Sequence, residues 1–128
     1  MKTDKTNNIK ISRHFNLQEF QCPCCKRVIL NSELLGKLVK LRLLIKEPIY
    51  INSGYRCLAE NTKVGGVLKS FHLFGMAADI SVRTISIPEL LYFAEKAKFG
   101  GIGIYPTFLH VDVRQKKPGG RANNGRVF

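Results

Sequence analysis

The sequence lacks a long run of apolar residues. Lys37, Lys40, Arg42 and Lys46 interrupt its most apolar stretch, and residues 1–10 are polar and charged. A membrane-spanning helix needs about 20 consecutive apolar residues, and a secretory signal needs an apolar segment near the N-terminus. We therefore expect no transmembrane helix and no secretory signal, and a protein that is made in the cytoplasm.

Acidic residues are also scarce. Nine Asp and Glu residues stand against 21 Lys and Arg residues, which gives a formal net charge of +12. Such a chain is attracted to polyanions, whether nucleic acid, anionic lipid or an acidic cell-wall polymer. There is no interleaved aromatic platform and no recognised nucleic-acid-binding motif, so a basic nucleic-acid-binding domain that uses the cysteines remains only the weakest alternative.

No internal repeat and no linker divides the chain of 128 residues, of which 45% are hydrophobic. We predict a disordered leader over residues 1–10 and one domain over residues 11–128, which we expect to be a monomer. The basic stretch over residues 114–121 is interpreted as a solvated C-terminal tail, with steering of an anionic substrate as the alternative.

Local patterns predict two helices and several strands. One helix begins at Asn31 or Ser32, either of which can cap it, and ends before Pro48. Another opens at Ser86, whose spacing to Glu89 is that of a capping box. Strands are expected near residues 48–53, 78–82, 99–105 and 109–113, with a loop over residues 61–67. These elements predict an α+β protein with a small, largely antiparallel sheet flanked by helices.

Four cysteines are unevenly distributed. Cys22, Cys24 and Cys25 are crowded together, whereas Cys57 stands alone. A metal knuckle, a disulfide to Cys57 and a set of reduced thiols are all open. A zinc finger is only weakly indicated, because Cys57 has no partner cysteine near it in the sequence. Without a secretion signal, reduced thiols are the default expectation.

Two histidines and one aspartate are candidate metal ligands. His72 and Asp79 lie seven positions apart, and His110 follows in a second alternating segment. Alternation places Asp79 and His110 on the polar faces of two strands. This ligand set suits a zinc ion that keeps a fourth position open for water, which would make the site catalytic. The alternative is that His72 caps a turn, Asp79 pairs with an arginine and His110 is a satisfied core histidine.

Several motifs occur in the order found in one known family. They are Ser53-Gly54-Tyr55-Arg56, Asn61, Val64-Gly65-Gly66, Ser70-Phe71-His72, Gly75 to Ile80, Gly101 to Tyr105 and His110 to Arg114. With them the chain resembles the zinc D-alanyl-D-alanine carboxypeptidases and murein endopeptidases, a peptidase M15-like family of the superfamily that also contains hedgehog domains. The resemblance covers approximately residues 15–114 and rests on the ordered set rather than on any single motif.

The resemblance implies a hedgehog/DD-peptidase-like fold and a zinc peptidase that hydrolyses peptide bonds of peptidoglycan through a metal-activated water. It implies that His72, Asp79 and His110 bind zinc and that Ser70 helps to bind substrate. It also implies that Arg56 stabilises the substrate carbonyl or a negatively charged intermediate. The alternative for Arg56 is a salt bridge with an aspartate. The small size resembles that of phage lysis proteins and small bacterial wall hydrolases.

One position departs from the family pattern. Many relatives carry an acidic residue as general base three positions before the last ligand, where this chain has Thr107. Asp112 is the nearest carboxylate in the motif, so we expect it to act as the base or as the orienting partner of a ligand. The departure keeps a second function open, a catalytically inactive, zinc-stabilised module that binds the cell wall.

Overall fold

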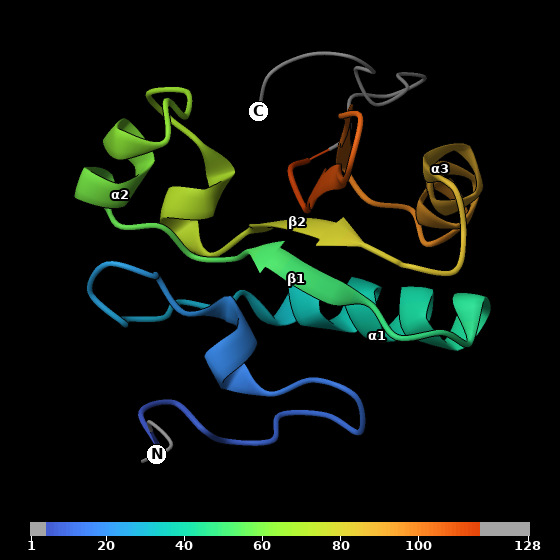
Figure 1. Cartoon of the computed structure of the whole chain (residues 1–128), viewed down its shortest axis with the longest axis horizontal. Coiled ribbons are helices and arrows are strands. Elements are labelled where there is room, and N and C mark those ends of the chain that lie inside the picture. The colour runs from blue at the N-terminus through green and yellow to red at the C-terminus, as the bar shows by residue number, and fades with distance from the viewer. Residues whose placement is uncertain (1–4, 116–128) are drawn as a thin grey trace.

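The computed structural model describes residues 5–115, which build a four-stranded antiparallel sheet with helices around it (Figure 1). The strand order is β1-β2-β4-β3. The strands are β1 (Tyr50–Ser53), β2 (Ala77–Ser81), β3 (Gly101–Ile104) and β4 (Leu109–Asp112). The predicted α+β class with a small antiparallel sheet is confirmed.

Two helices begin where the sequence predicts. In α1 (Ser32–Ile45) the Asn31 side chain caps the first turn by accepting hydrogen bonds from the N–H groups of Glu33 and Leu34. In α3 (Ile87–Lys96) the predicted capping box is present, with Ser86 and Glu89 each accepting from the other's backbone N–H. These caps satisfy donors that would otherwise lack partners at a helix start.

The loop predicted over residues 61–67 is wrong in its first part, because α2 (Leu58–Lys63) is helical. The cap of α2 is Cys57, whose Sγ accepts a hydrogen bond from the Glu60 N–H. Cysteine is not among the preferred caps, and six residues are too few to show a helical pattern of apolar positions. Two short 3-10 turns, η1 (Leu17–Phe20) and η2 (Phe71–Phe74), complete the elements.

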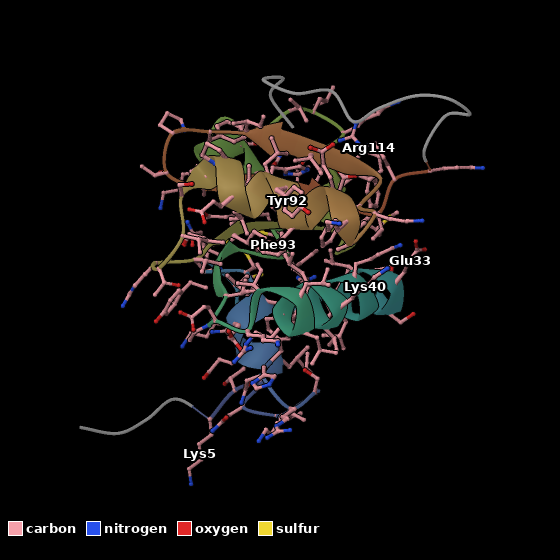
Figure 2. All side chains as sticks on the ribbon, turned by 90° about the vertical axis from the view of Figure 1, so that its right-hand side faces the viewer. Lys5, Glu33, Lys40, Tyr92, Phe93 and Arg114 are labelled. Atoms are coloured by element: carbon pink, nitrogen blue, oxygen red, sulfur yellow. The ribbon has the colours of Figure 1, made fainter. Side chains whose placement is uncertain are left out.

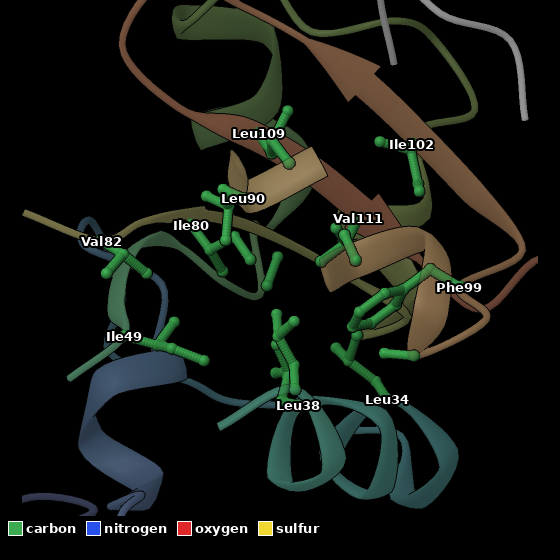
Figure 3. Close-up of a cluster of buried hydrophobic side chains, with 14 of the residues drawn as sticks. Leu34, Leu38, Ile49, Ile80, Val82, Leu90, Phe99, Ile102, Leu109 and Val111 are labelled. Carbon is green, nitrogen blue, oxygen red and sulfur yellow. The ribbon is translucent and has the colours of Figure 1, made fainter. Parts of the chain in front are cut away.

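The hydrophobic core lies between one face of the sheet and the helices α1 and α3 (Figure 3). The predicted alternation is confirmed, because the apolar positions of β2 and β4 and their flanks are all buried in this core: Ala78, Ile80, Val82, Leu109, Val111 and Val113. The helices contribute buried leucines, among them Leu34, Leu38 and Leu90. Figure 2 faces these two helices, which contact each other and leave Tyr92 on the outer surface. The other face of the sheet is therefore free to carry polar side chains.

The N-terminal segment contacts the rest of the fold. Residues 5–10 belong to the stretch expected as a disordered leader, yet the Asn7 side chain donates hydrogen bonds to Gln21 Oε1 and to the Lys26 carbonyl. Lys10 forms an isolated antiparallel bridge with Asn16. Residues 1–4 of the expected leader and residues 116–128 of the basic tail lie outside the described residues. Among the described helices, none has the length and apolarity to cross a bilayer.

Candidate metal centre

The register of the central strands brings two of the candidate ligands together. Asp79 on β2 pairs directly with His110 on β4, which pairs on its other side with Gly103 on β3. Directly opposed residues point to the same face of a sheet, here the face away from the core. His72 comes from η2, which ends at Gly75 in the left-handed conformation (φ 69°) before the chain enters β2. The chain thus returns to place His72 over Asp79.

Three ligand atoms converge. His72 Nε2 lies 3.0 Å from Asp79 Oδ1, and His110 Nδ1 lies 3.1 Å from the same oxygen. The two imidazole rings meet edge to face, with their centroids 5.1 Å apart. Both histidines are fully buried, while the Asp79 side chain is 14% exposed. The ligand set is therefore held by the protein and reached by solvent from the side of Asp79.

An acceptor lies behind each imidazole. His72 Nδ1 lies 2.7 Å from the Gly54 carbonyl oxygen, and His110 Nε2 lies 2.7 Å from Asp112 Oδ2. A carbonyl and a carboxylate only accept hydrogen bonds, so the ring nitrogens facing them carry the protons. In the neutral imidazoles the remaining nitrogens then present lone pairs to Asp79 Oδ1, which is itself an acceptor. Three acceptors at this spacing need a shared cation or additional protons.

A zinc ion fits this arrangement. Neutral imidazole and carboxylate are zinc ligands, and a metal-binding histidine normally donates its other N–H to a carbonyl or carboxylate, which sets its tautomer. Here both histidines have such a partner. The three described residues also stand out as a possible metal-binding group by the proximity of their ligand atoms. The donor set and the partners behind it thus fit a zinc ion.

The electrostatics of the site favour an anionic Asp79. Burial alone would raise the pKa of Asp79, but hydrogen bonds and charge from His110 and His72 outweigh burial and hold it well below its usual value. Burial opposes protonation of His110, yet hydrogen bonds with Asp112 and Asp79 raise the pKa of that imidazole. The carboxylate of Asp79 is therefore anionic throughout the neutral range, as a ligand for a divalent metal must be.

Asp112 is fixed behind His110 rather than beside the converging ligand atoms. Its side chain is fully buried, and the Arg114 side chain donates hydrogen bonds to both of its oxygens at 2.6 to 3.1 Å. Burial would raise the pKa of Asp112, but the hydrogen bonds from His110 and Arg114 lower it to about 2. Thr107 is exposed in the turn between β3 and β4.

Arg56 and Ser70 lie next to each other close to the ligands. The Arg56 Nη2 group lies 3.5 Å from Ser70 Oγ, and both side chains are buried. Within residues 5–115 no salt bridge joins Arg56 to Asp79 or Asp112, and its Nε–H finds no hydrogen-bond partner. Burial lowers the pKa of Arg56, with the negative charge of Asp79 opposing the shift. Arginine still remains protonated at neutral pH.

A family model for peptidase M15 matches residues 13–113, which is most of the chain. The protein belongs to the peptidase M15 family. It is similar to the peptidoglycan L,D-endopeptidase MepK of Escherichia coli, with 31% identity over 89 residues that cover 62% of this chain and 49% of the relative. It is also similar to the probable peptidoglycan L,D-endopeptidase MepK of Haemophilus influenzae, with 35% identity over 72 residues, 51% of this chain and 39% of the relative. The chain spans about half the length, or less, of these relatives. The match to the family model confirms the predicted M15-like membership.

Sequence reasoning missed two supports of this candidate site. The Gly54 carbonyl orients His72. Every residue has a backbone carbonyl, so residue types in the sequence cannot predict which one accepts this hydrogen bond. Arg114 holds Asp112, and its guanidinium lies 4.6 Å from the centre of the Phe71 ring. Arg114 follows Asp112 by two positions, which is the same-face spacing of an extended chain and could have predicted the pair.

Cys57 stands alone in the sequence but meets the other cysteines in three dimensions. Its Sγ lies 3.2 Å from that of Cys24 and 3.6 Å from that of Cys22. Cys25 joins the same group, and the described cysteines form no disulfide. The cysteines are far apart in the sequence but close in space, because the start of α2 folds back against the segment that follows η1.

Proposed function

We propose that this M15 family member is a zinc-dependent peptidase that hydrolyses peptide bonds of bacterial peptidoglycan, acting as an endopeptidase. The observation that carries the proposal is the convergence of His72 Nε2, Asp79 Oδ1 and His110 Nδ1, each imidazole with an acceptor behind it. The relatives named as peptidoglycan L,D-endopeptidases support the substrate and favour an endopeptidase over a carboxypeptidase.

His72, Asp79 and His110 would hold the zinc. When bound, zinc supplies a Lewis acid that polarises the scissile carbonyl and lowers the pKa of a coordinated water toward about 7. The Gly54 carbonyl keeps the proton of His72 on Nδ1, and Asp112 keeps the proton of His110 on Nε2. Both metal-facing nitrogens are thereby available without a conformational change, which supports a preorganised site.

Arg56 and Ser70 are proposed to bind the substrate. Arg56 brings a buried positive charge and an Nε–H donor that has no partner among the described residues. A charged donor in a water-poor site stabilises negative charge on a carbonyl oxygen more strongly than one in bulk water. Ser70 contacts Arg56 and also accepts from the His72 N–H, so it joins the arginine to the metal-binding turn.

Asp112 is proposed as the residue that positions His110, the second of the two roles expected from the sequence. Its oxygens are already occupied by His110 and by Arg114. Its pKa of about 2 makes it a weak proton acceptor at neutral pH. Both facts argue against Asp112 as the general base.

The experiment is digestion of purified peptidoglycan with the zinc-loaded protein, followed by separation and mass analysis of the products. An endopeptidase releases new muropeptides and exposes new amines, whereas a carboxypeptidase releases single D-alanine residues. We expect new muropeptides, no product after treatment with a chelator, and recovery when zinc is returned.

Variants separate the site from the rest of the protein. His110→Ala should lose activity and the zinc of the histidine centre, whereas His14→Ala removes an exposed histidine outside the site and should keep both. Zinc bound at the histidine centre of the wild type with no product from any wall type would instead identify the binding module. The exposed Thr107, in place of an acidic residue, is the observation that favours this second function.

A further inference from the structure

Four cysteine sulfurs converge in a group that is separate from the histidine centre. The Sγ atoms of Cys22 and Cys24 are 3.7 Å apart, and those of Cys22 and Cys57 are 3.6 Å apart. Cys25 belongs to the same group, whose ligand atoms all lie within 4.8 Å of one another. We propose that Cys22, Cys24, Cys25 and Cys57 bind a second zinc ion, which is structural.

The sulfur spacing matches a tetrahedral zinc. With Zn–S bonds of about 2.3 Å, neighbouring sulfurs of a regular tetrahedron are about 3.8 Å apart. The sulfurs of Cys22, Cys24 and Cys57 are 3.2 to 3.7 Å apart, which approaches this value. A disulfide would need about 2.05 Å between sulfurs. Four thiols that approach one another without forming a bond are best explained by a shared cation.

The local backbone forms a turn that brings the sulfurs of residues 22–25 together. The Lys26 N–H donates to the Cys22 carbonyl at 2.9 Å, and the Cys22 N–H donates to the Arg27 carbonyl at 2.8 Å. Lys26 adopts the left-handed conformation (φ 61°), which closes the turn directly after Cys25. Cys22 and Cys25 thus stand at the two-residue separation common in zinc sites. Cys57 completes the set from the start of α2.

The ligand types distinguish the two centres. Four cysteines fill all positions of a tetrahedral zinc and leave none for water, which is typical of structural sites. The histidine centre offers three protein ligands and leaves one position open. The cysteine site is therefore proposed to contribute stability, and it does not depend on whether the protein is an active peptidase.

The cysteine site would connect the N-terminal segment to the segment that supports the histidine centre. Cys22 follows η1 closely, and the Tyr55 N–H donates to the Phe20 carbonyl at 2.8 Å. Cys57 directly follows Arg56, and the Gly54 carbonyl in the same segment holds His72. A metal at the cysteines would hold the Cys57 end of residues 54–57, while the hydrogen bond to Phe20 holds Tyr55 near the other end. Loss of that metal is therefore expected to loosen the segment carrying Arg56 and the Gly54 carbonyl.

The experiment counts metal and identifies its ligands. The full chain is purified under reducing, anaerobic conditions, and its zinc content is measured by mass spectrometry of the metal. We expect about two zinc ions per chain in the wild type and about one in His110→Ala. Substitution of zinc by cobalt should give the intense thiolate-to-cobalt charge-transfer absorption in both proteins. A wild type without this absorption would overturn the proposal.

Cysteine variants provide the matched comparison. Cys24→Ser and Cys57→Ser should each lose one zinc and the thiolate absorption. Pro23→Ala, within the same turn, should keep two zinc ions and the absorption. If the cysteine variants do not fold, the wild-type and His110→Ala spectra still decide the question. A disulfide detected in the mass of the intact protein would also overturn the proposal. So would four thiols that react freely with a thiol reagent in protein that contains zinc only at the histidine centre.

Discussion

At the scale of single residues, the least exposed carboxylate near the candidate metal centre is Asp112, and its partners determine its role. Asp112 accepts from His110 on one side and from Arg114 on the other. The pair is packed closely against β3, because a Cβ atom at Gly101 would lie 2.5 Å from Asp112 Oδ1 and would also meet Arg114 Nε. The glycine is therefore required by the ion pair that holds the histidine.

Replacement of Asp112 tests its positioning role. Asp112→Asn removes the charge that holds Arg114 and the His110 N–H. We expect zinc affinity at the histidine centre to fall by about 10- to 100-fold, as is usual when a partner behind a metal-binding histidine is changed. Competition with a chromophoric chelator measures this affinity. Unchanged affinity combined with lost hydrolysis would instead assign Asp112 to proton transfer.

Two glycine substitutions should have opposite effects on stability. Gly101→Ala forces a methyl group into the buried ion pair, and we expect a loss of about 1–3 kcal/mol in the free energy of unfolding. Gly36→Ala lies on the exposed face of α1, where a Cβ atom meets nothing within 4 Å. It should raise stability by about 0.5–1 kcal/mol, because alanine favours helix. Urea denaturation of both variants gives the comparison, and equal effects would contradict the assigned contacts.

At the scale of elements, the capping box of α3 has a measurable dependence on pH. Hydrogen bonds from the Ser86 backbone N–H and hydroxyl lower the pKa of Glu89. A lowered folded-state pKa means that the unfolded chain binds the proton more readily. The charged Glu89 therefore stabilises the fold above its unfolded pKa of about 4.3, and this contribution disappears as the pH falls through the lowered value.

Glu89→Gln isolates that charge, since glutamine can still accept the capping hydrogen bond. We expect wild type to be more stable than the variant at neutral pH and the difference to shrink as the pH falls from about 6 to about 3. Thermal unfolding at several pH values measures the difference. In a Ser86→Ala background the pH dependence of the Glu89 substitution should largely vanish, and its persistence would argue against the pair as its source.

At the scale of the whole molecule, the net charge of +12 should govern encounter with an anionic wall. Raising the ionic strength from about 0.01 M to about 0.1 M shortens the range of electrostatic attraction from about 30 Å to about 10 Å. We expect co-sedimentation with peptidoglycan that carries anionic polymers to weaken over this range. Peptidoglycan stripped of those polymers is the control, and binding that is indifferent to salt would contradict electrostatic attraction.

Much of the fold and part of the site were predictable from local patterns. Asn31 and Ser86 marked the starts of α1 and α3, and alternation assigned Asp79 and His110 to the face opposite the core. These features depend on side-chain period and on capping, which act over a few neighbouring residues. The family resemblance rested on motifs in order and was confirmed by the match to the M15 model.

The sequence by itself therefore determined the fold class, the family and the candidate ligands. Only the tertiary structure decided which groups stand behind those ligands and which cysteines meet. The Gly54 carbonyl reaches His72 across 18 positions, and Cys57 reaches Cys22 across 35. Such contacts depend on how η2 and α2 fold back against η1 and the sheet. Pairing between distant segments follows from packing of the whole chain, so no local pattern encodes it.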